Sequence, residues 1–196
     1  MHIGIAILVD IEIHNIARNI MFNINKKYNT GVERALLPQH ISLKQSFPYS
    51  GQVDLLEDYL NDFFTRIKPF KVLIEKVEIQ ELLGEVVLGW LKIKECNELR
   101  DIHTQLCKEL KSKFNIEPLG FDGYTWQFHS TLVCSTINKA NITNIISDYH
   151  NKDISMKFEA NEVVMFCCLG DITKASQWFS LKKFNIGKWL IKLRYA

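Results

Sequence analysis

Two copies of one short pattern constrain what this sequence can fold into. The pattern is a histidine, any residue, a residue with a hydroxyl group and a leucine, and it occurs as HISL at 40–43 and as HSTL at 129–132. Both copies lie in segments whose apolar residues predict a β-strand. Side chains two apart in a strand point to the same face of the sheet. Each strand is therefore expected to present one imidazole and one hydroxyl group to a common side.

The segments that surround the two motifs follow one plan. Each motif strand is followed by a segment with the apolar spacing of an amphipathic helix and then by further strands. These segments are 55–67 and 71–94 after the first motif, and 138–149 and 154–193 after the second. Because the two halves share few residues, the repeat is one of architecture. We expect a single α+β domain over residues 1–196, with two pseudo-symmetric lobes, each an antiparallel sheet with flanking helices, around a central cleft.

Other segments complete the predicted architecture. A strand at 3–9 precedes a helix at about 11–28, and another helix is predicted at about 97–114. The first motif strand is expected to begin near Leu36 and to contain Pro38. Because proline cannot donate to a ladder, we expect it at the start of the strand or at a sheet edge.

Composition and charge exclude several classes of partner. Hydrophobic residues make up 47% of the sequence, which is enough for a sizeable core, and 24 basic against 22 acidic residues give a formal net charge of +2. A protein that wraps long duplex DNA usually has a strong basic excess, so such binding is not expected. No apolar run is long enough to span a bilayer, no signal peptide is apparent, and the five cysteines contain no CxxC pair. We expect a cytoplasmic monomer with reduced thiols and no membrane association.

The paired histidines suit the cleavage of a phosphodiester bond. One group must take a proton from the attacking water or hydroxyl, and another must give a proton to the leaving oxygen. Imidazole titrates near neutrality, so His40 and His129 can fill both roles without a metal. The hydroxyl groups of Ser42 and Thr131 can donate hydrogen bonds to the non-bridging oxygens of the phosphate. The same pattern is also compatible with two buried histidines that are hydrogen-bonded in a sheet core.

Basic and aromatic residues near the motifs are candidates for substrate binding. Lys44 follows the first motif and can supply positive charge to a phosphate, but it can equally be a solvated lysine at a strand end. Tyr124, Trp126 and Tyr49 can stack on a base, a contact worth about 1–3 kcal/mol, or can pack within the protein. Phe128 neighbours the second histidine and is expected to face the core.

One pair of potential metal ligands occurs outside the motifs. His103 and Cys107 are four residues apart on a predicted helix and therefore share a face. No second ligand pair at suitable spacing is found nearby. The sequence also lacks a P-loop, a GxSxG elbow and a dinucleotide-binding fingerprint. We therefore expect no metal and no cofactor.

The motifs HISL and HSTL resemble the paired His-x-Ser/Thr-x motifs of the two-histidine phosphoesterase superfamily, which includes the bacterial 2′-5′ RNA ligase and RNA 2′,3′-cyclic phosphodiesterase group. The order of the predicted elements resembles that family over nearly the whole chain, as does the closing segment at 178–187. The resemblance implies a bilobal fold in which the motif residues line one groove. It also implies that the two histidines are the general acid and base, in an order that stays open, and that the two hydroxyl residues hold the phosphate.

Two departures from the family pattern affect the expected site. Ser42 stands where threonine is common, a change that the mechanism tolerates. The second motif continues as Val133-Cys134-Ser135, where many relatives have a basic residue. The source of the positive charge that neutralises the phosphate is therefore open.

The predicted function is a metal-independent phosphodiesterase that hydrolyses a ribose-linked phosphate. The main candidate substrate is a 2′,3′-cyclic phosphate at an RNA or nucleotide end. One alternative is a phosphodiesterase for 2′-5′-oligoadenylate or a cyclic oligonucleotide. Another is a non-catalytic module that binds RNA or a nucleotide. In each case the expected partner is an RNA end or a small nucleotide or oligonucleotide.

Overall fold

The strands of this protein form two sheets. The computed structural model describes residues 1–82 and 85–187, and within them eight strands form two four-stranded antiparallel sheets. The strands are β1 (His2–Leu8), β2 (His40–Pro48), β3 (Phe70–Leu82), β4 (Val86–Lys94), β5 (His129–Thr136), β6 (Asp153–Ala160), β7 (Glu162–Cys168) and β8 (Trp178–Asn185). The helices are α1 (Ile11–Tyr28), α2 (Val53–Thr65), α3 (Asn97–Phe114) and α4 (Lys139–Tyr149), with short 3-10 helices η1 (Glu33–Leu36) and η2 (Ala175–Gln177). The predicted α+β class with two antiparallel sheets is confirmed. The predicted strand end at Leu193 lies outside the described residues.

Each sheet takes strands from both halves of the chain. The strand order is β2-β1-β7-β8 in the first sheet and β5-β4-β3-β6 in the second. The β3–β4 hairpin follows the first motif in sequence but lies in the sheet of the second motif. In return, β7 and β8 lie in the sheet of the first motif. The repeated plan in the sequence therefore does not divide the chain into one lobe per half.

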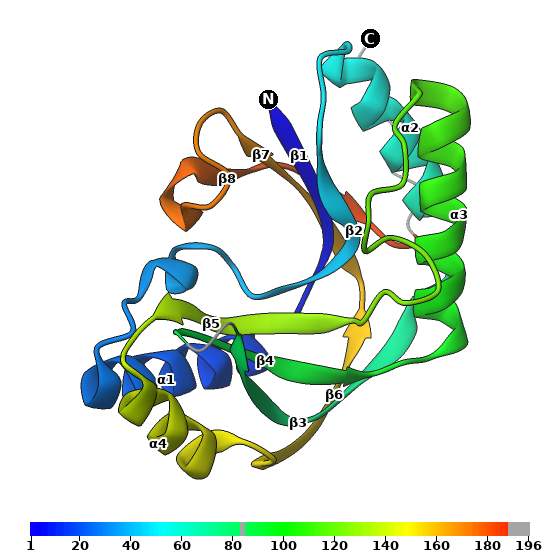
Figure 1. Cartoon of the computed structure of the whole chain (residues 1–196). Coiled ribbons are helices and arrows are strands. Elements are labelled where there is room, and N and C mark those ends of the chain that lie inside the picture. The colour runs from blue at the N-terminus through cyan, green and yellow to red at the C-terminus, as the bar shows by residue number, and fades with distance from the viewer. Residues whose placement is uncertain (83–84, 188–196) are drawn as a thin grey trace, which may run out of the picture.

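Both motif strands are edge strands, and they contact each other. Figure 1 shows β2 and β5 near the middle of the molecule, where the two sheets meet. A buried hydrogen bond joins β5 to the residue just before β2, because the Ser130 hydroxyl donates to the side-chain oxygen of Gln39 at 2.8 Å. Pro38 lies just before β2, whose edge position agrees with the predicted placement of the proline.

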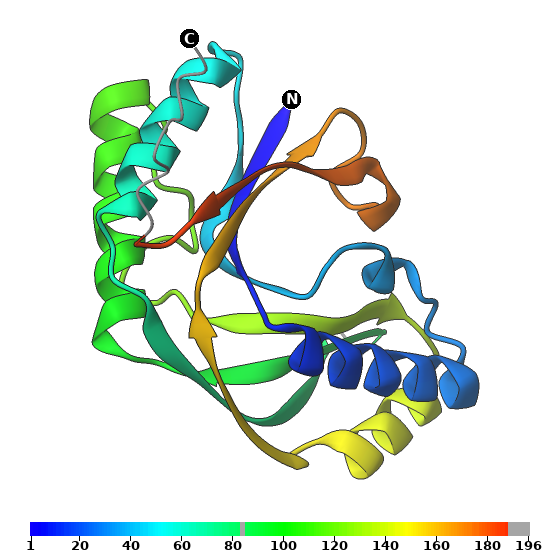
Figure 2. The same cartoon turned by 180° about the vertical axis from the view of Figure 1, so that it is seen from behind.

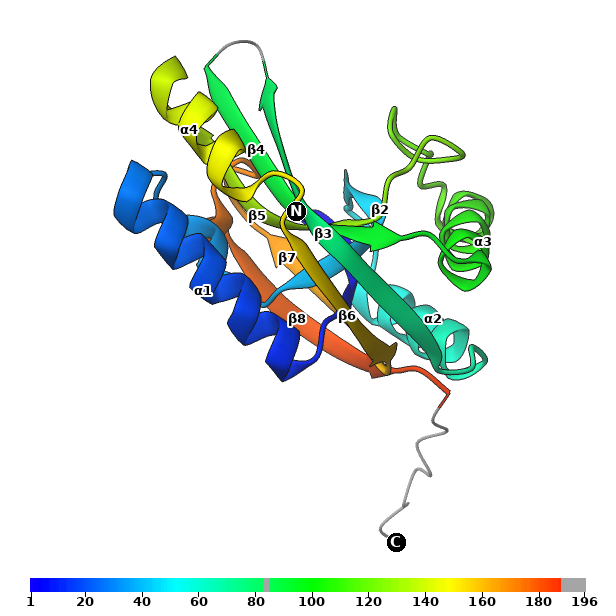
Figure 3. The same cartoon turned by 90° about the horizontal axis from the view of Figure 1, so that it is seen from below.

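The helices cover the two sheets in pairs. α1 and α4 lie side by side against the second sheet, and α2 and α3 lie side by side against the first (Figures 1 and 2). Figure 3 shows the two pairs at opposite ends of the molecule, with the strands between them. One apolar core includes residues from both sheets and from all four helices. Within the described residues, no helix combines the length and apolar character that crossing a bilayer requires. The expected cytoplasmic location stays a prediction.

The ends of α1 follow from local sequence. Asp10 caps the N-terminus, because its carboxylate accepts a hydrogen bond from the backbone N–H of Ile13 at 2.9 Å. Asn29 ends the helix in the left-handed conformation, with a φ of 54°. The helix contacts β5, and η1 follows it before the chain enters β2. The end of α1 thus places η1 beside the second motif strand.

The first motif strand contains an extra residue at the leucine of its motif. Ser42 pairs with Ala6, and Lys44 pairs with the preceding residue of β1, Ile5. Leu43 therefore has no partner in β1, which is the pattern of a β-bulge. Residues that pair directly point to the same face, so Ser42 lies with Ala6 on one face and Lys44 lies with Ile5 on the other.

The second motif strand contains the same irregularity. Thr131 pairs with Trp90 and Val133 pairs with Gly89, so Leu132 is the extra residue. Gly89 avoids crowding opposite this bulge, because a Cβ there would lie 2.8 Å from Cγ1 of Val133 and 2.5 Å from Cδ1 of Ile79 and would force these side chains to shift. In both strands, the residue after the leucine turns away from the histidine and toward the core.

Candidate active site

A cleft of about 270 Å³ lies where the two motif strands meet. Its wall is formed by β1, β2, β5, β7 and the start of β8, by η1 and the segment after it, and by the loops that precede β5 and β8. The predicted site residues that line it are His40, Ser42, Lys44, Trp126 and Thr131. His129 is not part of this wall, but it lies on the same strand as Thr131, two residues away, and its charge acts on His40. The structure therefore brings both motifs to one place.

The two imidazoles are oriented by the same device. Nδ1 of His40 lies 2.8 Å from the carbonyl oxygen of Pro38, and Nδ1 of His129 lies 2.8 Å from the carbonyl oxygen of Gln127. A carbonyl oxygen can only accept, so each Nδ1 carries the hydrogen and donates it. In the neutral ring, Nε2 is then the basic nitrogen. Both histidines thus keep Nε2 for exchanging a proton with a ligand.

The surroundings of the two imidazoles favour their neutral forms. Burial lowers the pKa of His40, and the nearby charges of His129 and Arg34 lower it further, while the bond to the Pro38 carbonyl acts to raise it. Burial also lowers the pKa of His129, against the opposing effect of the Gln127 carbonyl. Aromatic rings cause part of this burial. The ring centroids of His40 and Phe166 are 4.7 Å apart, and those of His129 and Trp90 are 5.8 Å apart.

The motif hydroxyl groups are available to a ligand. Ser42 and Thr131 are half-buried in the wall of the cleft. In the described part of the chain, neither side chain has a hydrogen-bond partner. Ser130, the middle residue between His129 and Thr131, is different, because its hydroxyl group is buried and bonded to Gln39. The structure thus separates one structural hydroxyl group from two that can donate to an anion.

Lys44 has a different role from the one that the sequence suggests. The bulge at Leu43 turns its side chain to the core, where Nζ lies 2.6 Å from Oδ2 of Asp122 and both side chains are fully buried. Its Nζ also lies 5.3 Å from the ring centroid of Phe47. Its charge is already paired, so we do not retain Lys44 as a phosphate ligand, nor is it a solvated lysine.

The three aromatic candidates lie in three different environments. Trp126 lines the cleft, donates from Nε1 to the carbonyl oxygen of Ser42 at 3.3 Å, and stacks on His103 with ring centroids 5.5 Å apart. Tyr124 is 94% exposed on the same loop and does not line the cleft. Tyr49 is buried, donates its hydroxyl to the carbonyl oxygen of Gln52 at 2.9 Å, and lies outside the cleft wall. Tyr49 is a packing residue here, so stacking on a base is not retained for it.

The cleft contains residues that the sequence pattern did not single out. Phe166 and Trp178 form apolar wall on the side of the first sheet, and Arg34 contributes a cation from η1. Phe166 lies in β7, which pairs with β1 and so lies near the first motif only through tertiary pairing. Arg34 lies in a short 3-10 helix outside both motifs, and Phe166 and Trp178 are distant from both motifs in sequence, so no local pattern marks the three as site residues.

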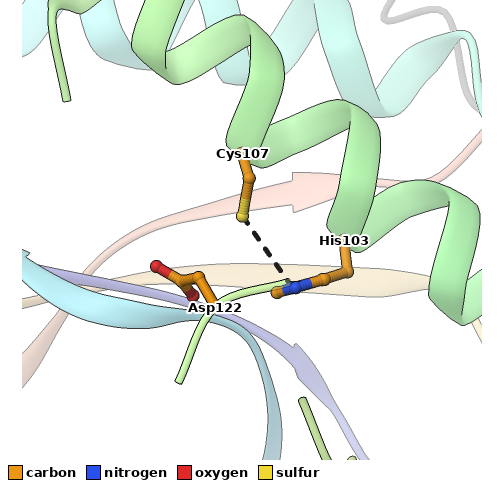
Figure 4. A group of neighbouring side chains, drawn as sticks. All are labelled: His103, Cys107 and Asp122. Carbon is orange, nitrogen blue, oxygen red and sulfur yellow. Dashed lines mark hydrogen bonds between the residues drawn. The ribbon is translucent and has the colours of Figure 1, made fainter. Parts of the chain in front are cut away.

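His103 and Cys107 of α3 lie close to Asp122, which is on the loop between α3 and β5 (Figure 4). The fit to a metal is poor, because these polar atoms already have partners. Nδ1 of His103 donates to the carbonyl oxygen of Leu43 at 2.7 Å, and Nε2 accepts from the N–H of Gly123 at 2.9 Å. Burial raises the pKa of Cys107 to about 11, so the thiol stays protonated. The cluster instead connects the loop that precedes β5 to β2 and α3 through hydrogen bonds.

Asp122 completes this attachment from the loop itself. Besides Lys44, its carboxylate accepts hydrogen bonds from the backbone N–H groups of Gln45 and Leu119, each at 2.9 Å. Arg100 of α3 donates to the carbonyl oxygens of Gly123 and Trp126 at 2.8 and 2.7 Å. These bonds set the position of Trp126 in the wall of the cleft.

Solved structures share this arrangement of sheets and helices, although no family model and no curated protein matches the sequence. The structure of TT0787 from Thermus thermophilus has a TM-score of 0.63 at 13% identity, with 95% of this chain and 98% of that chain covered. The structure of E. coli LigT in complex with 3′-AMP has a TM-score of 0.59 at 14% identity, with the same coverage. Usb1 from Kluyveromyces marxianus has a TM-score of 0.53 at 10% identity, with 92% and 97% covered. The chain therefore has the fold of these structures, with the two antiparallel sheets and flanking helices that the sequence predicts.

Proposed function

We propose that this protein is a metal-independent phosphodiesterase that hydrolyses a ribose-linked phosphate, with a 2′,3′-cyclic phosphate at an RNA or nucleotide end as its substrate. The observation that carries the proposal is the matched orientation of His40 and His129. Each donates from Nδ1 to the carbonyl oxygen two residues earlier, at 2.8 Å, and keeps Nε2 for proton transfer. Two such groups on adjoining strands are what an in-line displacement at phosphorus needs.

In the proposed reaction, water attacks the phosphorus of the cyclic diester. One imidazole takes the proton from the water as the new P–O bond forms. The other, as imidazolium, gives its proton to the 3′-oxygen as the bond from that oxygen to phosphorus breaks. The product is a 2′-phosphate with a free 3′-hydroxyl group. Ser42 and Thr131 donate hydrogen bonds to the non-bridging oxygens, where negative charge increases in the transition state.

The composition of the cleft supports an anionic ligand and a reaction without a metal. The described residues of its wall include no aspartate or glutamate. Carboxylates are the usual protein ligands of Mg²⁺ at sites that process phosphates. The wall instead supplies hydroxyl groups, an imidazole and the Arg34 guanidinium. This donor set suits a phosphate directly.

A nucleotide is supported by the aromatic wall and by similar structures. Trp126 offers a ring in the cleft wall next to Ser42, and stacking on such a ring contributes about 1–3 kcal/mol per base. Two similar structures, those of E. coli LigT, contain 3′-AMP and ATP. We therefore propose a nucleotide or RNA end as the partner of this cleft.

A turnover panel in EDTA tests the proposal. The substrates are an RNA end with a 2′,3′-cyclic phosphate, a 2′-5′-linked oligoadenylate and a cyclic oligonucleotide, and the variants are His40→Ala and His129→Ala. The control is His150→Ala, since His150 lies at the end of α4 and accepts from the N–H of Ile79 at 3.1 Å. We expect cleavage of the cyclic phosphate by wild type and by the control, and loss of turnover in both motif variants.

The same panel separates the alternatives. Tyr124 is almost fully exposed on the loop that carries Trp126, a position from which it can contact a second base of a longer substrate. Preferential cleavage of the oligoadenylate or of the cyclic oligonucleotide would favour that alternative. Nucleotide binding without any product would favour a non-catalytic module. Loss of wild-type turnover in EDTA, or full turnover in either motif variant, would contradict the two-histidine mechanism.

A further inference from the structure

Arg34 is a cation at the junction of the two motif strands. It lies in η1, which contacts β5, and its side chain lines the cleft together with His40, Ser42 and Thr131. It also lines a neighbouring hollow of about 300 Å³ against β5. Its charge is close enough to His40 to act on the pKa of that imidazole. Arg34 is therefore placed to contact a substrate phosphate that binds between the two motifs.

The guanidinium of Arg34 has no protein partner among the described residues. The other three arginines in that part of the chain are all engaged. Arg18 donates to the carbonyl oxygen of Ala35 at 2.8 Å, Arg66 to that of Asp62 at 3.0 Å, and Arg100 to the carboxylate of Glu95 at 2.6 Å. Arg34 is half-buried rather than extended into solvent. A guanidinium without a protein partner among the described residues has N–H donors available to an anion that enters the cleft.

The backbone around Arg34 is held in place from both sides. The hydrogen bond from Arg18 to Ala35 ties η1 to α1, and Ala35 itself is buried. On the β2 side, the N–H of Gln39 donates to Nδ1 of His14 at 3.2 Å. The base of the Arg34 side chain is thus fixed by the fold, which reduces the conformational entropy that binding a phosphate would cost.

Among the described residues of the cleft wall, no other lysine or arginine is free to pair with a phosphate. Lys44, the other lysine or arginine of the wall, is paired with Asp122 in the core. Past the second motif, β5 continues with Val133, Cys134 and Ser135, none of which is charged. Cys134 lines the neighbouring hollow together with Arg34. A dianionic or monoanionic phosphate in the cleft would therefore meet one available permanent cation.

We propose that Arg34 binds the phosphate group of the substrate through its guanidinium and neutralises the charge that develops on the non-bridging oxygens. Arginine presents parallel N–H donors that match two phosphate oxygens. The inference deepens the proposed function and rests on it for the chemistry of the ligand. Arg34 would supply the positive charge, while Ser42 and Thr131 would supply neutral hydrogen bonds. The acid–base work would stay with the histidines.

Binding and turnover of Arg34→Gln and Arg34→Lys test this assignment. The binding probes are adenosine 2′-monophosphate and adenosine, compared by calorimetry, because their difference isolates the phosphate. We expect Arg34→Gln to weaken binding of the monophosphate about 10- to 100-fold, leave adenosine binding unchanged, and lower kcat/KM about 100- to 1,000-fold. Arg34→Lys, which keeps the charge but loses the paired donors, should fall between wild type and Arg34→Gln. The control is Arg66→Gln, the same change at an exposed arginine that follows the end of α2.

The two readouts keep this inference separate from the proposed function. If no diester is hydrolysed but Arg34→Gln still loses the preference for the monophosphate, the proposed function fails and the assignment of Arg34 stands. If Arg34→Gln keeps the wild-type preference, or if the wild-type protein binds the monophosphate no better than adenosine, the assignment is overturned. An equal effect of Arg66→Gln would also overturn it, because the contribution would then be one of net charge alone.

Discussion

The two motif strands, β2 and β5, have the same local geometry. Each is the edge strand of its sheet, each begins with a histidine that donates to the carbonyl oxygen two residues earlier, and each contains a bulge at the motif leucine. The sequence repeat is therefore also a repeat of geometry. It orients the two imidazoles in the same way, and in both sheets the motif strand pairs with the strand that precedes it in sequence, β1 or β4.

The surroundings of the two strands differ. His40 has beside it the ring of Phe166 and Arg34, which has no partner among the described residues. His129 pairs with Lys92 of β4, and the ammonium group of Lys92 forms an ion pair with Glu78, with Nζ 3.1 Å from Oε1. Available positive charge thus lies with the first motif. We therefore expect the two histidines to be capable of the same chemistry, and their neighbours to decide which one acts as acid and which as base.

The largest expected effect is a difference between the His40 and His129 variants in how their rates depend on the leaving group of the substrate. Because Arg34 and His129 both disfavour a charge on His40, we expect His40 to be the base and His129 the acid. A nucleoside p-nitrophenyl phosphodiester has a leaving group that needs no proton. His129→Ala should therefore lose about 100- to 10,000-fold in turnover of the cyclic phosphate but keep most of the rate on the p-nitrophenyl ester, while His40→Ala loses both.

Steady-state rates on the two substrates measure this difference directly, and His150→Ala again serves as the control. If His40→Ala were the variant rescued by the good leaving group, the roles would be reversed. Equal behaviour of the two variants on both substrates would mean that the imidazoles do not divide the acid and base roles, and the asymmetry argued from Arg34 would be of no consequence.

A second difference between the strands lies directly after the bulges, where β2 has Lys44 and β5 has Val133. Replacing Lys44 by methionine leaves the Asp122 carboxylate buried without its partner, which should lower the free energy of unfolding by about 3–5 kcal/mol. The matched control is Lys27→Met, which breaks an exposed pair with Asp148 and should cost less than about 1 kcal/mol. Urea unfolding of both variants compares them. Equal costs would show that the buried pair contributes no more than a surface pair.

The contrast between Lys44 and the motif residues shows how far sequence could predict this site. The histidines and hydroxyl residues are set by alternation along a single strand, a local property that the pattern of apolar residues reveals. Lys44 would share their face by the same rule, but the bulge at Leu43 reverses it. Its partner Asp122 is 78 positions away, so the pair depends on tertiary packing.

The same limit applies to the elements. The bounds predicted for α1 and α3, 11–28 and 97–114, agree with the structure because long amphipathic helices carry a strong periodic signal. The first motif strand is predicted to begin near Leu36, whereas the structure ends η1 there and starts β2 at His40. The exchange of strands between sheets is likewise non-local, because β1 pairs with β7 across most of the chain.

The third prediction concerns the glycine opposite the second bulge. Gly89→Ala would place a Cβ within 2.8 Å of Val133 and 2.5 Å of Ile79, so the bulge or its neighbours must shift. We expect a cost of about 1–3 kcal/mol in the free energy of unfolding. Gly4→Ala is the control in the first sheet, because its Cβ would meet Trp178 at an ordinary 3.6 Å, and it should change stability by less than about 1 kcal/mol. A Gly89→Ala variant as stable as Gly4→Ala would show that the bulge at Leu132 adapts freely.

The smallest expected effect is a shift in the pH profile of kcat/KM, which reports the groups of the free protein. Burial lowers the pKa of both histidines below the ordinary value of 6.5, and the charges of His129 and Arg34 lower that of His40 further. The rate falls on the acid side when the base is protonated and on the alkaline side when the acid is deprotonated. The optimum should therefore lie below pH 6.5.

Arg34→Gln sharpens this prediction, because it removes one of the two positive groups that act on His40. The pKa of His40 should then rise, and the acid limb of the profile should move to higher pH, while Arg66→Gln should leave it in place. The same shifts have a consequence for stability. Both histidines bind protons more readily in the unfolded chain, so the free energy of unfolding should decrease as the pH falls below about 6.5. An acid limb that does not move in Arg34→Gln would show that the charge of Arg34 is not felt at His40, and the difference between the two motif strands would then have to come from their aromatic neighbours.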